Sequence, residues 1–545
     1  MDRRERPGLT PDHAVILPMP ESLYKLLQDA ATKHGGRIAL VAGDHSMTYA
    51  ELLYASDRAA AYLAGHGARP GRRVAFCFRK STDAIVALFG LIRTGATYVP
   101  LDPAWPVERI RTLCRDAEIS LWTGTDPPPA VPGIVASVTS KTKSEGGASL
   151  DSAAEIEPDG APPQRPPDGV TNILYTSGST GQPKGVEITE RSLLHFSQWV
   201  VATFGLTAED RVANHAPYNF DLSTLDIFAA VRAGATMYPV PERVKMFPYQ
   251  LAEFIAEKKI TTWYSVPSAL IMLQLRGRLE VHDLSELRHV IFAGEVMPKS
   301  ALQGLARRLP NAAFTNLYGP TETNVCTWHR IEERDLTSDE PIPIGRPIDD
   351  TRVWIVGEDG AEVGNGDSGE LLVAGPTLTA GYFGDGSSTD HRLIPAPDGR
   401  GRAYRTGDRV SRGNDGVLMF HGRLDRMIKC RGHRIEPGEI EAVLCRHPNV
   451  KEAAVIPIPD PVFGNRIRAC VAAHDDRSIQ EPELASLCRN ELPSCMLPDE
   501  WRLVDRLPRT DRGKVDYARL AAAETPNSPD GTERVRVGQS PADGD

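Results

Sequence analysis

The sequence has few cysteines and no cysteine pair spaced for a metal site. Its 545 residues include eight cysteines, which are scattered along the chain without any C-x-x-C pair. Scattered cysteines in a large acidic chain are typical of reduced thiols in a core, whereas disulfide and zinc frameworks use closely spaced pairs. We therefore expect neither framework, and we expect a cytoplasmic protein.

Long apolar runs and an excess of positive charge are also missing. No stretch approaches the ~20 apolar residues that a membrane-spanning helix needs, and the charged N-terminus lacks the pattern of a signal peptide. Acidic residues outnumber basic ones, 72 to 62, which gives a net charge of −10 and a pI of about 5.8. This balance argues against a nucleic-acid binder and against a polybasic membrane anchor.

What is present is an alternation of helix and strand patterns. Residues 49–67 have helical spacing and end in glycine, 72–78 read as a buried strand, 81–95 as a helix and 96–102 as a strand. This alternation continues to about residue 420 and predicts an α/β fold, with parallel or mixed sheets covered by helices. From Gly422 onward the pattern changes to that of a small α+β domain.

These patterns divide the chain into a large and a small domain. We expect a large N-terminal domain over residues 1–424, a small C-terminal domain over 425–522 and a disordered tail over 523–545, because the tail has little to pack. Residues 123–169 are rich in proline and polar residues, so we expect a surface excursion from the large domain.

One glycine-rich stretch, LYTSGSTGQPKGV at residues 174–186, stands between two predicted strands. Glycines let backbone N–H groups turn towards an anion, and hydroxyls and a lysine add donors and charge. Its spacing is not that of a Walker P-loop, because Pro183 stands where the second glycine should be. Composition alone leaves a flexible loop and a polyphosphate site as equal alternatives.

The order of residues in this stretch resembles the signature of the AMP-forming adenylate-forming superfamily, which includes acyl-CoA synthetases, luciferases and nonribosomal peptide adenylation domains. The resemblance extends from about residue 20 to residue 520, because further motifs of the family follow in order. These are TYAEL (48–52), TGATYVPLDP (94–103), NFDLS (219–223), NLYGPTE (316–322), GELLVAGPTLTAGY (369–382), YRTGD (404–408), GRLDRMIKCRGHRIEPGEIE (422–441) and RGKVD (512–516).

The resemblance implies an ATP site. Tyr318 would lie against adenine, Asp408 would bind the ribose hydroxyls, and Glu322 would bind Mg²⁺, a hard cation suited to carboxylate and phosphate oxygens. Taken alone, YGP would be read as a turn, and the aspartate of TGD as part of a turn or as a helix cap. The full set implied for ATP is Thr176, Ser177, Gly178, Ser179, Thr180, Gly181, Gly294, Glu295, Asn316, Tyr318, Gly319, Thr321, Asp408 and Arg423.

The resemblance also implies the catalytic lysines, Lys514 and Lys184. A substrate carboxylate must attack the α-phosphate of ATP, and a positive charge between two anions stabilises the developing charge. Asp425 matches the family's hinge, which would make the small domain mobile and able to withdraw Lys514 before a thiol enters.

Asp221 of the NFDLS motif indicates an amino-acid substrate, because a buried ammonium needs a counter-charge. Capping of the following apolar helix is the structural alternative for this residue. The matching pocket positions are apolar except for one phenol and one thiol, which excludes substrates with charged or amide side chains. They are Leu222, Leu225, Tyr264, Ile291, Ala293, Leu317, Val325 and Cys326.

This set is most similar to that of free-standing L-proline:prolyl-carrier-protein ligases, which load proline for pyrrole-type biosynthesis. The expected substrates are therefore a small apolar amino acid and ATP, with a separate phosphopantetheine-bearing carrier protein as partner. A D-alanine:carrier-protein ligase is the alternative, and other small apolar amino acids and modified prolines stay open as substrates. An acyl-CoA ligase is less favoured because of Asp221.

Overall fold

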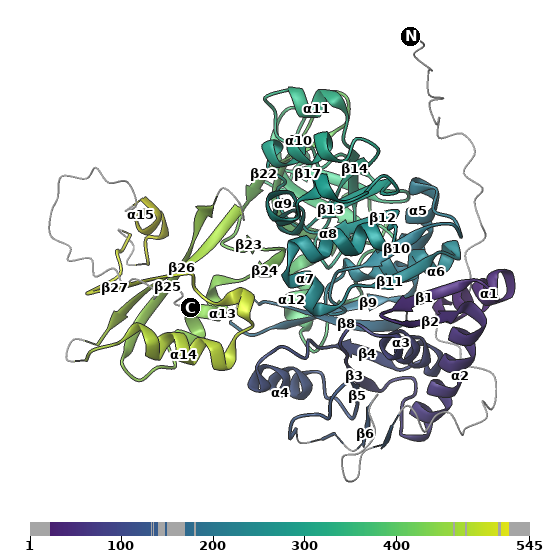
Figure 1. Cartoon of the computed structure of the whole chain (residues 1–545). Coiled ribbons are helices and arrows are strands. Elements are labelled where there is room, and N and C mark those ends of the chain that lie inside the picture. Colours follow the sequence, from purple (N-terminus) through teal and green to yellow (C-terminus); the bar gives the residue numbers. More distant parts are fainter. Residues whose placement is uncertain are drawn as a thin grey trace. The chain divides into compact units, whose positions relative to one another are not determined.

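The computed structural model describes residues 22–131, 133–134, 136–139, 148–149, 169–178, 181–460, 464–474, 477–510 and 514–522. They form two compact units (Figure 1). The larger unit runs to Asp425 and the smaller one begins at Arg426. The loop segment Ser177–Gln182 groups with the smaller unit. The predicted tail at 523–545 lies outside the described residues.

The larger unit contains two extended sheets. The first has the order β16 (Arg346–Pro347), β15 (Thr327–Arg330), β14 (Ala313–Tyr318), β13 (His289–Ala293), β12 (Thr262–Ser265), β10 (Arg211–Asn214), β11 (Thr236–Pro239), β1 (Ile38–Ala42) and β2 (His45–Thr48). The second has the order β19 (Gly381–Tyr382), β9 (Lys184–Thr189), β8 (Val170–Thr176), β4 (Thr97–Pro100), β3 (Arg73–Cys77), β5 (Leu121–Gly124), β6 (Ala136–Thr139) and β7 (Ala148–Ser149).

Neighbouring strands from β10 to β14 and from β8 through β4 and β3 to β5 pair in parallel, whereas β8–β9 and β14–β15 are antiparallel. The sheets are therefore mixed. The accompanying helices are α1 (Leu23–His34), α2 (Tyr49–Gly65), α3 (Thr82–Thr94), α4 (Val107–Asp116), α5 (Glu190–Phe204), α6 (Ala230–Ala233), α7 (Glu242–Met246), α8 (Pro248–Glu257), α9 (Pro267–Arg276), α10 (Lys299–Arg308), α11 (Glu333–Thr337) and α12 (Gly386–Arg392), with a 3₁₀ turn η3 (Leu279–Val281).

Local signals fix the helices that the sequence predicted. Thr48 and Glu51 form a capping box at the start of α2. Ser81 caps α3, which ends at Gly95 in the left-handed conformation (φ 73°). Because such caps satisfy backbone groups at helix ends, the boundaries of these helices can be read from sequence.

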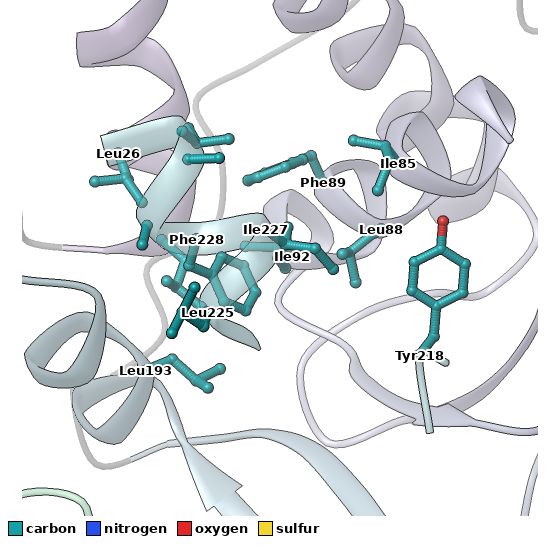
Figure 2. Packing of buried hydrophobic residues seen from close by; sticks show 14 of the residues in the cluster. Leu26, Ile85, Leu88, Phe89, Ile92, Leu193, Tyr218, Leu225, Ile227 and Phe228 are labelled. Atoms are coloured by element: carbon teal, nitrogen blue, oxygen red, sulfur yellow. The ribbon is translucent and has the colours of Figure 1, made fainter. Parts of the chain in front are cut away.

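The largest hydrophobic cluster joins side chains of both extended sheets with those of α1, α2, α3 and α5. Figure 2 shows part of it, where α3 meets a short π-helix, η2 (Leu225–Ala229). Phe228 of η2 packs edge-on against Phe89 of α3, with ring centroids 6.2 Å apart. Every residue of η2 is buried, so this segment is anchored from all sides.

A third sheet completes the larger unit. It has the order β17 (Arg352–Val356), β18 (Ser368–Ala374), β21 (Arg402–Arg412) and β20 (Leu393–Pro395), and β22 (Leu418–Arg423) also pairs with β21. All of these pairings are antiparallel. The β21–β22 pairing sets Asp408 opposite Arg423.

The smaller unit is an α+β domain with its own core. Strand β26 (Gly464–Ala473) lies between β25 (Val450–Asp460) and β27 (Glu500–Val504), and β23 (Ile428–Cys430) pairs with β24 (His433–Ile435). Ile440, Leu444, Ile467 and Leu484 are fully buried in its principal cluster. Its other elements are α13 (Pro437–Leu444), α14 (Glu481–Glu491), the 3₁₀ turn η4 (Ser494–Met496) and α15 (Tyr517–Ala522).

The predicted α/β fold class is confirmed. One difference concerns residues 123–169, where we expected a surface excursion. Ala136–Thr139 forms strand β6, which pairs with β5, and its Val138 is fully buried. A four-residue strand beside proline-rich sequence has too few apolar residues to give a visible pattern. Residues 140–147 and 150–168 lie outside the described residues. No described helix is both long and apolar enough for a membrane span.

Candidate active site

The glycine-rich stretch is the turn between β8 and β9, as predicted. Thr176 ends β8 and pairs with Lys184, the first residue of β9. Ser177 Oγ donates to the backbone carbonyl of Arg434 (2.7 Å). Gly178 accepts at its carbonyl from the N–H of Gly181 (3.0 Å), which has a positive φ of 82°. Two further residues of this stretch that were predicted to bind ATP, Ser179 and Thr180, lie outside the described residues.

Lys184 is held on the larger unit by three groups. Its Nζ donates to Ser388 Oγ (2.6 Å), lies 3.7 Å from Asp385 Oδ2 and is 5.4 Å from the centre of the Tyr382 ring. These contacts hold the ammonium in a defined place while the side chain stays partly exposed. The arrangement suits a lysine that receives an anion, because its direction is set before the anion arrives.

Glu322 is fully buried and connects to the same tyrosine. Tyr382 donates its hydroxyl to Glu322 Oε1 (2.7 Å) and is 3.2 Å from the hydroxyl of Tyr404. Tyr382 therefore contacts two of the predicted site residues. Lys184 lies near its ring, and Glu322, the predicted Mg²⁺ ligand, accepts from its hydroxyl. The β9–β19 pairing produces this arrangement, since it sets Tyr382 opposite Val186.

Glu322 offers a single carboxylate to a metal ion, which fits Mg²⁺ only when the ion also binds substrate phosphates. Within the described residues, no group of three or more His, Cys, Asp or Glu side chains could hold a metal ion. A single carboxylate suits Mg²⁺ that also binds substrate phosphates, because Mg²⁺ usually uses one or two carboxylates together with phosphate oxygens. Glu322 would then hold the ion, which would neutralise phosphate charge.

Tyr318, Asp408 and Arg423 form a connected group at β14, β21 and β22. Tyr318 donates its hydroxyl to Asp408 Oδ2. Arg423 Nη1 donates to Asp408 Oδ1 (2.8 Å) and to the carbonyl of Thr406 (2.8 Å). Only 1% of the Asp408 surface is exposed. The predicted adenine and ribose residues are thus hydrogen-bonded to each other.

The electrostatics of this group follow from burial and charge. Burial raises the pKa of Tyr318, and the carboxylate of Asp408 raises it further, so the phenol stays protonated and donates. Burial alone would lower the pKa of Arg423, but Asp425 and Asp408 raise it above its ordinary value. Arg423 Nε donates to Asp425 Oδ1 (2.9 Å), so the predicted hinge residue is ion-paired at the end of the larger unit.

Close packing shapes the turn after β14. A Cβ atom at Gly319 would come within 1.6 Å of the carbonyl oxygen of Asn324, so only glycine fits there. Asn316 donates its side-chain amide to the carbonyl of Pro343 (2.8 Å). Thr321 accepts at its carbonyl from the N–H of Asn324 (3.4 Å). These bonds hold the YGPTE turn against the end of the sheet.

The remaining predicted ATP residues follow β13. Gly294 has a positive φ of 92°, which glycine adopts without strain. Glu295 Oε2 accepts from the backbone N–H of Ser268 (2.9 Å), the second residue of α9. A carboxylate at a helix N-terminus is electrostatically favourable, so Glu295 stabilises the start of α9.

Sheet register brings the predicted pocket residues together. Tyr264 of β12 lies opposite Ile291 of β13, and Ala293 lies opposite Leu317 of β14. Ala293 ends β13 and Leu317 is the last residue but one of β14, so these two positions lie at the carboxyl ends of parallel strands, where ligands bind in α/β sheets. Seven of the eight apolar positions share one buried cluster; these are Leu222, Leu225, Tyr264, Ile291, Ala293, Leu317 and Val325.

Cys326 packs elsewhere. It belongs to the neighbouring cluster that contains Tyr318, and its thiol donates to the carbonyl of Tyr318 (3.4 Å). Val325 and Cys326 precede strand β15 and pack into two different clusters. Cys326 therefore packs with Tyr318 rather than with the other pocket residues.

Asp221 is the acidic member of the predicted pocket, with 8% of its surface exposed. Burial raises the pKa of Tyr264, and the carboxylates of Asp221 and Asp226 raise it further. The phenol of Tyr264 is therefore near both carboxylates. The site combines one predicted ammonium partner with apolar walls, as an amino acid with a hydrocarbon side chain would require.

Lys514 belongs to the smaller unit and is exposed. It lies in a turn before α15, where its carbonyl accepts from the N–H of Thr510 (2.8 Å). Its neighbours Arg512 and Gly513 lie outside the described residues.

Residue-by-residue reasoning missed Tyr382, Tyr404 and Ser388. Tyr382 ends the GELLVAGPTLTAGY motif and Tyr404 begins YRTGD, so both stood inside recognised motifs. Tyr382 contacts Glu322 and Tyr404 contacts Tyr382; both contacts join residues far apart in the chain, which a single sequence does not reveal. Ser388 had no motif signal.

Comparisons with known proteins agree with this geometry. Residues 27–383 match the AMP-binding enzyme family and residues 439–514 match the AMP-binding enzyme C-terminal domain. The L-proline--[L-prolyl-carrier protein] ligase of Streptomyces coelicolor is 38% identical over 533 residues, which is 94% of this chain and 99% of that protein. The ligase of the same name from Pseudomonas fluorescens is 35% identical over 506 residues, covering 92% and 98%.

A solved structure shares the fold. The amide bond synthetase McbA from Marinactinospora thermotolerans superposes with a TM-score of 0.82 at 25% identity, covering 92% of this chain and 99% of that one. The fold is that of adenylate-forming enzymes. Because more than half of its length matches the family, the chain belongs to the AMP-binding enzyme family.

Proposed function

We propose that the protein activates L-proline with ATP as prolyl-AMP and transfers the prolyl group to a separate carrier protein. The observation that carries this proposal is the sheet register that gathers Tyr264, Ile291, Ala293 and Leu317 near the buried Asp221. Two relatives at 38% and 35% identity are L-prolyl-carrier-protein ligases, and they support proline as the acid.

The apolar walls and the single carboxylate suit proline. Asp221 would pair with the secondary ammonium, and the pyrrolidine ring would lie among hydrocarbon side chains. A substrate with a charged or amide side chain would bury polar groups without partners, which costs several kcal/mol or about 10²-fold or more in selectivity. Selection would therefore come from both pairing and exclusion.

The proposed reaction has two steps. In the first, a carboxylate oxygen of proline attacks the α-phosphorus of ATP, the bond to the β-phosphate breaks, and pyrophosphate leaves. In the second, the phosphopantetheine thiolate attacks the acyl carbon of prolyl-AMP, the bond to AMP breaks, and a prolyl thioester forms. No general base is needed in the first step, because the carboxylate is already ionised at neutral pH.

The charged residues divide the work of the first step. We propose that Lys184 holds the departing phosphates and that Lys514 approaches the α-phosphate, where a point charge stabilises the transition state. Tyr318 and Asp408 would bind adenine and ribose. Glu322 would hold Mg²⁺, and Asp425 would act as the hinge.

The predicted domain limits, 1–424 and 425–522, are part of the proposal, as are a cytoplasmic location and a role in pyrrole-type or other nonribosomal biosynthesis. The acceptor would be a carrier protein that bears phosphopantetheine, since the relatives named above act with prolyl-carrier proteins.

The test is amino-acid-dependent ATP–pyrophosphate exchange over a panel of L-proline, D-proline, D-alanine, glycine and L-valine. We expect the highest kcat/KM for L-proline. Exchange with L-proline no greater than the no-substrate blank would show that the proposal is wrong, and stronger exchange with D-alanine would make D-alanine the substrate.

A second assay addresses the acceptor. Radiolabelled proline should be transferred to a phosphopantetheine-bearing prolyl-carrier protein, and not to the same carrier with its attachment serine replaced by alanine. Equal transfer to free coenzyme A would instead indicate an acyl-CoA ligase.

A further inference from the structure

A buried polar cluster lies beside the proposed amino-acid pocket, next in the chain to the pocket residue Leu225. It consists of Lys80, just before α3, Asn214, at the end of β10, and Asp226, in the π-helix η2. Lys80 Nζ donates to Asn214 Oδ1 (2.5 Å), and Asn214 Nδ2 donates to Asp226 Oδ2 (3.2 Å). Asn214 and Asp226 are fully buried.

Asn214 and Asp226 close the two ends of one chain segment. Residues 214–226 leave the sheet after β10, turn, and enter η2, and Asp221 lies near the middle of this loop. The Asn214–Asp226 hydrogen bond joins the loop's ends, and the backbone N–H groups of His215 and Ala216 also point at Asp226. The segment that carries Asp221 is therefore tied at its base.

Lys80 makes three contacts with residues 214–218, the first part of the loop. Besides Asn214, it donates to the carbonyl of Ala216 (2.5 Å) and lies 3.9 Å from the centre of the Tyr218 ring. Tyr218 in turn packs edge-on against Phe76 of β3, with centroids 5.4 Å apart. Figure 2 shows Tyr218 near Ile85 and Leu88 of α3. The loop is thus anchored on a different sheet from the one it leaves.

Burying the ionisable groups of Lys80 and Asp226 costs free energy of folding. Burial raises the pKa of Asp226 to about 8, with Lys80 acting in the opposite direction, and burial lowers the pKa of Lys80. An apolar core would avoid this cost. π-Helical turns frequently occur at functional sites, where an inserted residue redirects a side chain.

We propose that Lys80, Asn214 and Asp226 form a clamp that positions Asp221, and that they thereby set the enzyme's selectivity for an amino group. The inference rests on the proposed function, because it assigns Asp221 to the substrate ammonium. The three residues act through Asp221 and are positioning residues. Leu225, the pocket residue that directly precedes Asp226 in η2, connects the clamp to the pocket, where it shares one buried cluster with Tyr264.

The variants Lys80→Met and Asp226→Asn test the clamp independently, since each replaces an ionisable side chain by a neutral one of similar size. Displacing a substrate-binding group by about 1 Å can cost up to about 10²-fold. We expect each variant to raise the KM for proline about tenfold or more, with the KM for ATP changed less than about threefold.

A substrate analogue separates positioning from general damage. Tetrahydrofuran-2-carboxylic acid has the ring and carboxylate of proline but an ether oxygen in place of the nitrogen. Its inhibition constant against proline exchange should stay nearly unchanged in both variants, because it has no ammonium for Asp221. Equal weakening of proline and the analogue would overturn the proposal.

A double-mutant cycle with Asp221→Asn gives the second readout. If the clamp acts through Asp221, Lys80→Met should raise the KM for proline in the wild-type background and leave it unchanged in the Asp221→Asn background. Additive effects would overturn the proposal.

Arg288→Met is the matched control, because Arg288 pairs with the buried Asp210 just before β10. The Arg288→Met variant should be less stable than wild type, but the ratio of its KM for proline to its KM for ATP should be unchanged.

The outcomes separate the clamp from the proposed function. Wild-type exchange with proline but no selective effect in either variant refutes the clamp alone. If the wild type exchanges only with another amino acid, proline is the wrong substrate, and the same cycle applies to that acid and its deaminated analogue. Should either variant fail to fold, as judged by its thermal transition, the other variant decides.

Discussion

Replacing Arg423 with methionine should damage stability and ATP binding together, while leaving amino-acid binding intact. The Arg423 side chain is 11% exposed and its partner Asp408 is 1% exposed. The substitution removes four hydrogen bonds that the Arg423 side chain donates. Asp408 keeps the hydrogen bond that it accepts from the Tyr318 hydroxyl.

The expected size follows from burial. Breaking a buried ion pair by removing one partner costs about 3–5 kcal/mol, because the remaining charge stays buried. We expect the free energy of unfolding of the larger unit to fall by about 3 kcal/mol in Arg423→Met. In the double variant Asp408→Asn/Arg423→Met no charge is stranded, so the two effects should couple by about 2 kcal/mol.

Urea unfolding followed by tryptophan fluorescence measures this, because six of the seven tryptophans precede residue 425. Arg409→Met is the matched control on β21, since Arg409 is exposed and donates to Ser368; it should change stability by less than about 0.5 kcal/mol. The KM for ATP should rise in the Arg423 variant without a matching rise for proline. A coupling below about 0.5 kcal/mol, or equal rises in both constants, would refute the reasoning.

Three further predictions concern other parts of the site. Lys514→Ala should lower kcat for exchange about 10²-fold or more with no loss of stability, because the side chain is exposed; an unchanged rate, compared with the exposed Lys451→Ala, would contradict its role. Gly319→Ala should raise the KM for ATP, since its Cβ would meet the Asn324 carbonyl; ATP titration in the exchange assay measures this. Burial lowers the pKa of His215 from 6.5 to about 3, so its contribution to stability is present above pH 6.5 and is lost as the pH falls towards 3. Between pH 6.5 and 5 the loss should be about 2 kcal/mol, and urea midpoints of His215→Gln should show a smaller drop over this range than wild type.

Much of the fold could be predicted because its signals are local. The helix at 81–95 was visible from spacing and from its terminal glycine, and the structure has α3 at Thr82–Thr94. The strand at 96–102 corresponds to β4. The turn between β8 and β9 was predicted from two apolar runs around a glycine-rich stretch. Such features depend on neighbouring residues, and the sequence contains them in full.

The site was only partly predictable because its contacts are distant in sequence. Tyr382 meets Glu322 across 60 positions and Lys80 meets Asn214 across 134. Tertiary packing creates both contacts, because Lys80 and Glu322 lie in loops whose partners come from other elements, and no single stretch of sequence encodes this packing. The π-helix at 225–229 was read as part of an ordinary helix, since the apolar pattern of this segment is the same for both.

The walls of the proposed pocket are also part of the protein's main core. Tyr264, Ile291 and Leu317 lie in the same continuous cluster as Leu27 of α1 and Phe89 of α3. Altering the substrate range of this enzyme is therefore a core-design problem. Reducing Tyr264 to alanine to admit a larger acid would cost about 3–5 kcal/mol unless the acid itself fills the space. Engineered variants should consequently fold best in the presence of the substrate they were made for, and libraries should begin from a stabilised parent.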